Sequence, residues 1–319
     1  MPDGDILIGG DWKPTSDGQT LPVFNPSDGS EFAKIARGNA RDIDAAVQAA
    51  RKAMDGAWGR MPAAERGRLM LKLSLKIAEH AEELAVLECK DTGKPMSQGK
   101  ADATALARYF EFYGGAADKV HGETIPYQNG YTVLTLREPH GVCGQIIPWN
   151  YPMQIFGRTA AGALAMGNAI VVKPAEEACL SILRVGQLML EVGFPPGAVN
   201  IVPGLGHEAG QALSDHPGID HMSFTGSRQV GTLVQAAAAK FNRPVTMELG
   251  GKSPQVVFAD ADMDAALPFI TRAIILALTV SLIGIGGVGR VGVGGVLAII
   301  TLGAGLTRVI ALTRAALAA

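Results

Sequence analysis

The sequence predicts an α/β fold with a doubly wound, Rossmann-like parallel sheet. Short apolar runs alternate with helical patterns from residue 142 onward, and 48% of the 319 residues are hydrophobic, enough to bury a large core. Near-continuous apolar strands joined by helices form a sheet that is covered on both faces. We expect strands at Val142–Ile147, Ala169–Lys173, Val199–Val202, His221–Phe224 and Val245–Met247, with helices near 153–166, 178–192, 207–214 and 227–240.

The part of the chain before this sheet is predicted to contain short strands, then helices, then an exposed arm. Residues 5–38 consist of extended pieces broken by turn signals such as Asp17-Gly18. Helices are expected from Asp42, from Pro62 through Leu87, and from about Ser97 to Ala117. Alternating polar and β-branched residues in Tyr131–Glu138 favour a ribbon, so we expect an arm at about 120–139, of a kind that often mediates assembly.

Charge and cysteine content exclude several classes of partner. A net charge of -2 and a pI near 6.3 give no broad attraction to nucleic acid, and they make a membrane surface an unexpected partner. The acidic start of the chain is not followed by an apolar signal segment, so we expect a cytoplasmic protein. Cys89, Cys143 and Cys179 are odd in number and widely spaced, which favours a reducing compartment, and we expect no metal site.

The composition changes abruptly near Leu267. Residues 268–319 contain no Asp, Glu, Lys, His, Asn, Gln or Tyr, the residue types whose codons have adenine in second place. A frameshifted or misassembled gene explains this loss, and so do one or two membrane-spanning helices at 273–289 and 291–307. Dense glycine and the lack of an aromatic belt favour the frame error.

Two motifs follow predicted strands at the edge of the sheet where ligands of doubly wound folds bind. Pro148-Trp149-Asn150-Tyr151 places an amide, that of Asn150, where it could donate to a developing oxyanion; an ordinary turn asparagine is the alternative. Lys173 and Glu176 place a cation and a carboxylate where the hydroxyls of an adenosine ribose would lie. Taken singly, they are equally compatible with a surface lysine and a helix-start glutamate.

Two further motifs involve glycine. Gly226 and Ser227 form a turn before a helix, and the free N–H groups of that helix could receive a pyrophosphate, although this is not the GxGxxG pattern. Glu248 follows a buried strand and precedes two glycines. Desolvation there could tune it as a general base, and a capping or salt-bridged glutamate is the alternative.

Together, PWNYP, KPAE, FTGSxxVG and ELGGKSP resemble the NAD(P)-dependent aldehyde dehydrogenase superfamily over about residues 8–266. In that family a cysteine thiolate attacks the aldehyde, an asparagine amide holds the oxyanion, hydride passes to the nicotinamide, and a glutamate-activated water hydrolyses the thioester. The resemblance implies Asn150 as oxyanion donor and Glu248 as general base. It implies cofactor contacts at Ile147, Pro148, Trp149, Lys173, Glu176, Gly206, Gly226, Ser227, Gly231 and Leu249.

The resemblance also implies the ligands and partners. A carboxylate at Glu176 would repel a 2′-phosphate, so NAD is favoured, with NADP possible. The partners implied are a small-molecule aldehyde and further copies of the chain, because relatives form homo-oligomers.

The tail departs from the family pattern. The nucleophile should lie downstream of Glu248 in a segment resembling N-x-G-Q-x-C, but Leu276–Gly284 contains no such motif and no cysteine follows Cys179. Reading the gene in its other frames past codon 275 should reveal the motif. We therefore expect an NAD(P)-binding domain at 1–266, a tail at 267–319 in place of most of the catalytic domain, and no activity. The alternative is a nucleotide-binding pseudoenzyme, possibly membrane-tethered.

Overall fold

The computed structural model describes residues 4–251, 256–258 and 260–271. The chain divides into two compact units, Met1–Gly250 and Gly251–Ala319. The predicted tail, with both candidate membrane segments and Leu276–Gly284, lies almost wholly outside the described residues, so its origin stays a prediction. Within the described part of the chain, no helix is long and apolar enough to cross a membrane.

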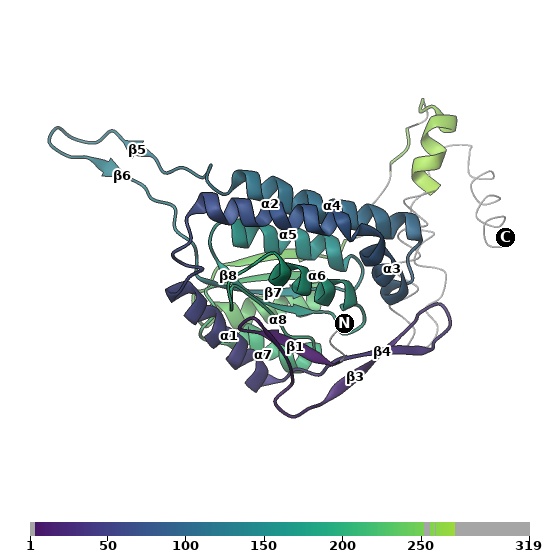
Figure 1. The fold of residues 1–319 in the computed structure, drawn as a ribbon. Coiled ribbons are helices and arrows are strands. Elements are labelled where there is room, and N and C mark those ends of the chain that lie inside the picture. Colours follow the sequence, from purple (N-terminus) through teal and green to yellow (C-terminus); the bar gives the residue numbers. More distant parts are fainter. Residues whose placement is uncertain (1–3, 252–255, 259, 272–319) are drawn as a thin grey trace. The chain divides into compact units, whose positions relative to one another are not determined.

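The first unit is built on a seven-stranded sheet (Figure 1). In spatial order its strands are β11 (Val245–Leu249), β10 (His221–Gly226), β7 (Val142–Ile147), β8 (Ala169–Pro174), β9 (Val199–Ile201), β1 (Asp5–Ile8) and β2 (Asp11–Pro14). The first five run parallel, which confirms the doubly wound α/β prediction. The last two are antiparallel additions from the N-terminus, joined through the pairing of Leu7 with Ile201.

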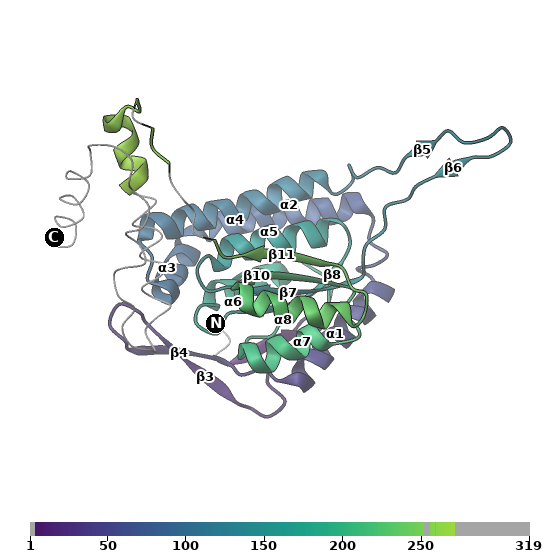
Figure 2. The ribbon, with the colours of Figure 1, turned by 180° about the vertical axis from the view of Figure 1, so that it is seen from behind.

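Helices cover both faces of this sheet (Figure 2). One face carries α1 (Ala40–Asp55), the π-helical turn η1 (Gly206–Gly210), α7 (Gln211–Asp215) and α8 (Arg228–Ala239). The other face carries α5 (Pro152–Ala165) and α6 (Leu180–Glu191), backed by α2 (Ala63–Glu79), α3 (Ala81–Thr92) and α4 (Met96–Ala116). The expected amphipathic patterns account for the packing: in α1, for example, Ile43, Val47 and Ala50 are fully buried.

The predicted helix from Pro62 through Leu87 is wrong as a single element. It breaks at His80, which ends α2 and begins α3 with φ -100° and ψ 13°. The His80 N–H is still bonded to helix α2 and its carbonyl accepts from Leu84, while the ring Nδ1 lies 2.6 Å from Glu83 Oε2. Because the apolar period continues across this break, the sequence pattern gave no sign of it.

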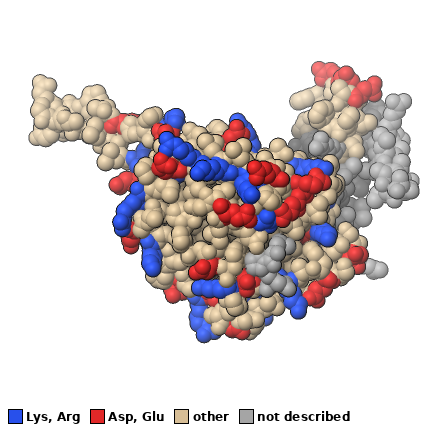
Figure 3. Space-filling model, in the orientation of Figure 1, with Lys and Arg blue, Asp and Glu red and all other residues tan. Residues whose placement is uncertain are grey.

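The exposed arm is a short antiparallel ribbon of β5 (Thr124–Ile125) and β6 (Val133–Leu134), which projects from the first unit in Figure 1. Residues 124–136 carry no charged side chain, and in Figure 3 the arm is almost entirely uncoloured by charge. The N-terminal region adds a second ribbon, β3 (Thr20–Phe24) with β4 (Glu31–Ala36). In the second unit, Asp262 accepts hydrogen bonds from the N–H groups of Asp264 and Ala265 and so caps the helical residues 263–271.

Helix α3 contains a buried carboxyl that is only half satisfied. Asp91 is 3% exposed, and its Oδ2 accepts a hydrogen bond from the Leu180 N–H at the start of α6 (2.7 Å). Its Oδ1 has no hydrogen-bond partner within the described part of the chain. Burial, reinforced by the charge of Glu88, raises the pKa of Asp91 to about 8. Asp91 is therefore protonated in the folded protein at neutral pH.

Because the pKa of Asp91 is raised in the folded protein, we expect the stability of the chain to depend on pH. As pH rises from about 4 to about 8, the unfolded chain releases the Asp91 proton while the folded protein keeps it, so the free energy of unfolding should fall by at most about 1.4 kcal/mol per pH unit. Asp91→Asn keeps an oxygen for Leu180 and removes the charge, so it should flatten the slope. Urea denaturation across this window measures it, with Asp55→Asn at the exposed end of α1 as control. An unchanged slope in Asp91→Asn would contradict the assignment.

Candidate active site

The register of the parallel strands brings the four motifs to one edge of the sheet. Lys173 pairs with Ile146, Ile146 with Phe224, and Phe224 with Met247. The residues that follow these four positions all lie at the carboxyl ends of their strands. Ile146 and Phe224 are 78 residues apart in the chain, yet their strands are adjacent at the edge where doubly wound folds bind ligands.

At the end of β8 a buried cation holds a half-buried carboxylate. Lys173 Nζ lies 2.6 Å from Glu176 Oε2, and the Gly206 N–H donates to Glu176 Oε1 (3.2 Å). Burial opposes ionisation of Glu176, but the charge of Lys173 and these hydrogen bonds hold its pKa below the ordinary value. The carboxylate is thus ionised and fixed beside the start of η1.

At the end of β10 the turn into α8 is shaped by two glycines. Ser227 caps α8, with its Oγ accepting from the Val230 N–H (3.3 Å). A Cβ at Gly226 would lie 2.7 Å from the Phe224 ring, and one at Gly231 would lie 2.5 Å from a Leu249 methyl group. Gly226 therefore leaves room for the Phe224 ring, and Gly231 allows α8 to pack closely on β11. The first turn of α8 is exposed.

After β7 the chain turns through Pro148 and Trp149 to Asn150, all half-buried, while Ile147 is buried. The Oδ1 atom of Asn150 accepts a hydrogen bond from the Tyr151 N–H (3.1 Å). This bond fixes the orientation of the amide, so its Nδ2 group is the end that can donate to a ligand. Pro152 then begins α5.

Glu248 lies in the edge strand β11 and is exposed, so the expected burial of this strand and desolvation of this carboxylate are not found. Its side chain lines an open pocket of about 750 Å³ on the α5 side of the sheet. Lys173 points to the opposite side, because its Cδ atom is 3.9 Å from where a Cβ on Gly210 would lie. Among the predicted site residues within the described ranges, Glu248 alone lines this pocket; Asn150 and Gly226 lie at the carboxyl ends of β7 and β10 and do not line it. The candidate site therefore spans the edge of the sheet from one face to the other.

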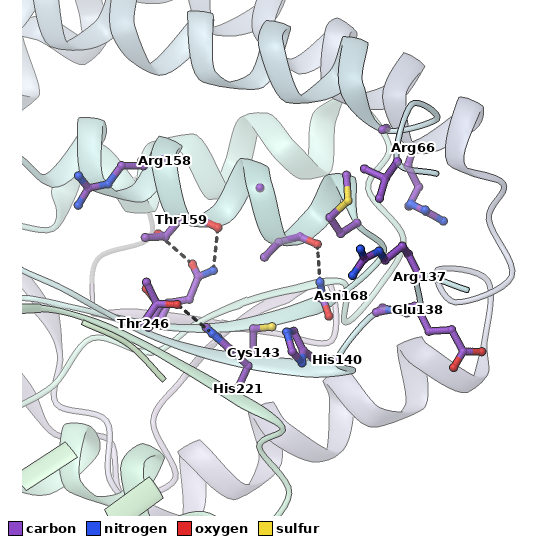
Figure 4. A pocket seen from close by; sticks show the side chains of 18 of the residues that line it. Arg66, Arg137, Glu138, His140, Cys143, Arg158, Thr159, Asn168, His221 and Thr246 are labelled. Atoms are coloured by element: carbon purple, nitrogen blue, oxygen red, sulfur yellow. Dashed lines mark hydrogen bonds between the residues drawn. The ribbon is translucent and has the colours of Figure 1, made fainter. Parts of the chain in front are cut away.

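The rest of this pocket extends toward the amino ends of the strands. His140 and His221 stack at 5.0 Å between ring centroids, and His221 Nε2 lies 3.1 Å from Thr246 Oγ1 (Figure 4). Burial lowers the pKa of His221, with a further contribution from His140. Cys143 also lines the pocket, and burial raises the pKa of its thiol to about 12.

The other two cysteines are no better suited to nucleophilic attack. Cys179 is fully buried and its pKa lies well above the ordinary value because of that burial. Burial also raises the pKa of Cys89. Because the thiolate is the reactive form, none of the chain's three cysteines is activated.

Comparison with known proteins identifies the family. The family model described as "Aldehyde dehydrogenase family" matches residues 12–277. The chain belongs to the aldehyde dehydrogenase family. Human retinal dehydrogenase 2 is 47% identical over 266 residues, which cover 82% of this chain and 51% of that protein. The mitochondrial aldehyde dehydrogenase family 2 member B4 of Arabidopsis thaliana is 48% identical over 265 residues, covering 82% of this chain and 49% of that protein.

Solved structures of this family share the fold. The NAD+ complex of an aldehyde dehydrogenase from Bacillus cereus superimposes with a TM-score of 0.84 at 41% identity, over 86% of this chain and 56% of that one. A Burkholderia cenocepacia protein described as a candidate aldehyde dehydrogenase gives 0.84 at 63% identity, over 85% and 57%. The chain therefore spans about half the length of the relatives it matches.

Sequence reasoning missed a buried polar cluster that contacts the segments following β7 and β8. Glu88, Lys94 and Asp102 are each at most 6% exposed and lie around the turn between α3 and α4. The available signal was that Glu88 and Asp102 occupy helix positions where a core-facing apolar residue is expected. The turn was interpreted only as the end of a helix at Gly93 and Pro95.

Proposed function

We propose that this aldehyde dehydrogenase-family chain binds NAD+ across the carboxyl edge of its sheet. The observation that carries the proposal is the hydrogen-bonded set formed by Lys173, Glu176 and the Gly206 N–H, at the same edge of the sheet as the exposed first turn of α8. A fixed carboxylate can accept both ribose hydroxyls, and the N–H groups that begin α8 can receive the pyrophosphate. NADP+ is a weaker ligand in this proposal, because its 2′-phosphate would face Glu176.

The residues present fit this cofactor by their chemistry. Glu176 is ionised, as a ribose acceptor must be, and the exposed first turn of α8, with its free N–H groups, is accessible to a phosphate. Ile147, Pro148, Trp149, Gly231 and Leu249 are the remaining proposed contacts, and each belongs to a strand end or to the adjoining helix turn. The solved relatives include NAD+ complexes, which supports the proposal by analogy.

In the proposed reaction of the whole protein, an aldehyde is oxidised to a carboxylic acid. NAD+, when bound, supplies the hydride acceptor. Asn150 is the proposed oxyanion donor, because its amide is oriented through Tyr151. Glu248 is the proposed general base and faces a pocket that water can enter. The nucleophilic thiolate is not supplied by Cys89, Cys143 or Cys179, so we propose that the chain as written binds NAD+ without oxidising aldehydes.

Assembly into homo-oligomers is part of the proposal. The arm exposes an unusual number of large apolar side chains for a free ribbon: between 59% and 79% of each is exposed in Tyr127, Tyr131, Leu134 and Leu136.

The domain boundary at residue 266 and the frame error beyond codon 275 also remain proposals.

A titration tests cofactor binding. NAD+ should quench the emission of Trp149 in a saturable way, and Lys173→Ala should weaken binding by about tenfold, the weight of a charged hydrogen bond. Lys240→Ala, on the exposed end of α8, is the matched control because it also removes a lysine that pairs with a carboxylate, Asp215 (2.8 Å). No NADH should form on addition of aldehydes. Failure of the parent chain to bind NAD+ would reject the proposed function, and turnover would reject the assigned lack of a nucleophile.

A further inference from the structure

A buried ion cluster lies beneath the candidate site. Lys94 Nζ is 3.0 Å from Glu88 Oε1 and 2.5 Å from Asp102 Oδ2. The side chain of Lys94 is 4% exposed, and those of the two carboxyls are fully buried. Glu88 belongs to α3 and Asp102 to α4, so the ammonium joins two helices of the outer layer.

One side of the cluster reaches the helix that follows Asn150. Asp102 Oδ1 accepts a hydrogen bond from Gln154 Nε2 (2.6 Å), in the first turn of α5. Lys94 Nζ also lies over the ring of Tyr151, 4.6 Å from its centroid. Tyr151 is the N-cap of α5 and donates the N–H that orients the Asn150 amide. The cluster therefore holds the loop that presents Asn150.

The other side of the cluster reaches the helix that follows Glu176. Glu88 Oε2 accepts a hydrogen bond from Ser181 Oγ (2.6 Å), in the first turn of α6. Asp91, on the same helix as Glu88, accepts from the Leu180 N–H. The segment from Glu176 to Cys179 runs directly into this turn. Both strand-end segments of the candidate site are thus anchored to one set of side chains.

The charges in the cluster suggest that it fixes the positions of neighbouring elements more than it adds stability. A single ammonium faces two carboxyls, and burial raises the pKa of Glu88 against the opposing effect of Lys94. Burial acts to lower the pKa of Lys94, but the two carboxylates outweigh it and raise that pKa. Apolar side chains could fill such a space at no loss of stability. What the ions add is directional bonding that fixes the distance between neighbouring elements.

We infer that Lys94 is a positioning residue, which through Asp102–Gln154 and Glu88–Ser181 sets the spacing between the Asn150 loop and the Glu176 segment. The inference rests on the proposed function for its consequence, since that spacing would determine how well one dinucleotide contacts both. The links from Lys94 through Asp102–Gln154 and Glu88–Ser181 are present in the chain without cofactor.

Three variants separate the links. Gln154→Met cuts only the link to α5, Ser181→Ala cuts only the link to α6, and Lys94→Met removes the centre. Ser74→Ala is the matched control, because its hydroxyl makes a similar buried bond, 2.8 Å to the Ala107 carbonyl, away from the site. Hydrogen–deuterium exchange of residues 148–154 and 174–181 is measured without cofactor, and the Kd for NAD+ is measured alongside.

The expected pattern is specific to each link. Gln154→Met should raise exchange in 148–154, Ser181→Ala in 174–181, and Lys94→Met in both. The Kd should rise by about threefold for each single link and about tenfold for Lys94→Met, while Ser74→Ala, despite a similar loss of stability, leaves both readouts at the parent values.

Other outcomes overturn the inference. Exchange that rises uniformly through the first unit, or variants that lose stability like Ser74→Ala with unchanged exchange in both segments, would show a merely structural cluster. Should Lys94→Met fail to fold, the Gln154 and Ser181 variants decide between these outcomes. If the parent chain does not bind NAD+, the proposed function is rejected. The exchange pattern alone then decides whether Lys94 positions the two segments.

Discussion

Replacing Lys94 with methionine is expected to lower the free energy of unfolding by about 3–5 kcal/mol. The substitution leaves the carboxyls of Glu88 and Asp102 fully buried and facing each other without a cation. Methionine fills most of the volume of the lysine stem, so the loss reports the missing charge rather than a cavity. Urea denaturation measures it.

Two controls make this stability prediction specific. Lys100→Met breaks a pair with Glu82 at a similar distance, 2.9 Å, but both side chains are more than half exposed, so little change is expected. Combining Lys94→Met with Glu88→Gln and Asp102→Asn should restore part of the loss, because no uncompensated charge remains. If the neutral triple variant were less stable than Lys94→Met alone, buried charge would not be the cause.

Replacing Glu176 with serine is expected to raise the affinity for NADP+ relative to NAD+ by about 10-fold to 100-fold. The substitution removes the carboxylate that would repel a 2′-phosphate and frees Lys173, now 2.6 Å from that carboxylate, to face the added phosphate. The ratio of the two dissociation constants is the measurement, since it cancels any general effect on folding.

The neighbouring carboxylate provides the control for this specificity change. Glu177→Ser alters the adjacent residue, whose pKa is raised by burial and by Glu176 and which makes no bond to Lys173 within the described structure. It should leave the ratio unchanged. A Glu176→Ser variant that weakens both cofactors equally would mean that this carboxylate does not face the 2′ position.

The local pattern of the sequence was sufficient for most elements of the sheet. All five parallel strands were predicted within a few residues, because each contains apolar residues in a short segment bounded by turn signals. The motifs at the ends of β7, β8, β10 and β11 were also recognised from the sequence. Because parallel strands bring their carboxyl ends to one edge of the sheet, the sequence predicted that these motifs lie along the same edge.

The break at His80 and the pairing of β1 with β9 were not predictable from the same pattern. An apolar period specifies which face of an element is buried, and it is blind to a local change of backbone direction that keeps that face inward. Pairing between Leu7 and Ile201 joins residues far apart in the chain. The sequence of either strand would be equally compatible with another partner strand.

The sequence by itself determined the α/β class, the family and the absence of any cysteine beyond Cys179, because these depend on residue identity and spacing. Only the tertiary structure decided that Glu248 and Lys173 lie on opposite faces of the sheet and that Lys94 connects the Asn150 loop with the Glu176 segment. The reason is that contacts between helices packed side by side depend on how layers stack, and side chains that meet there share no local pattern in the chain.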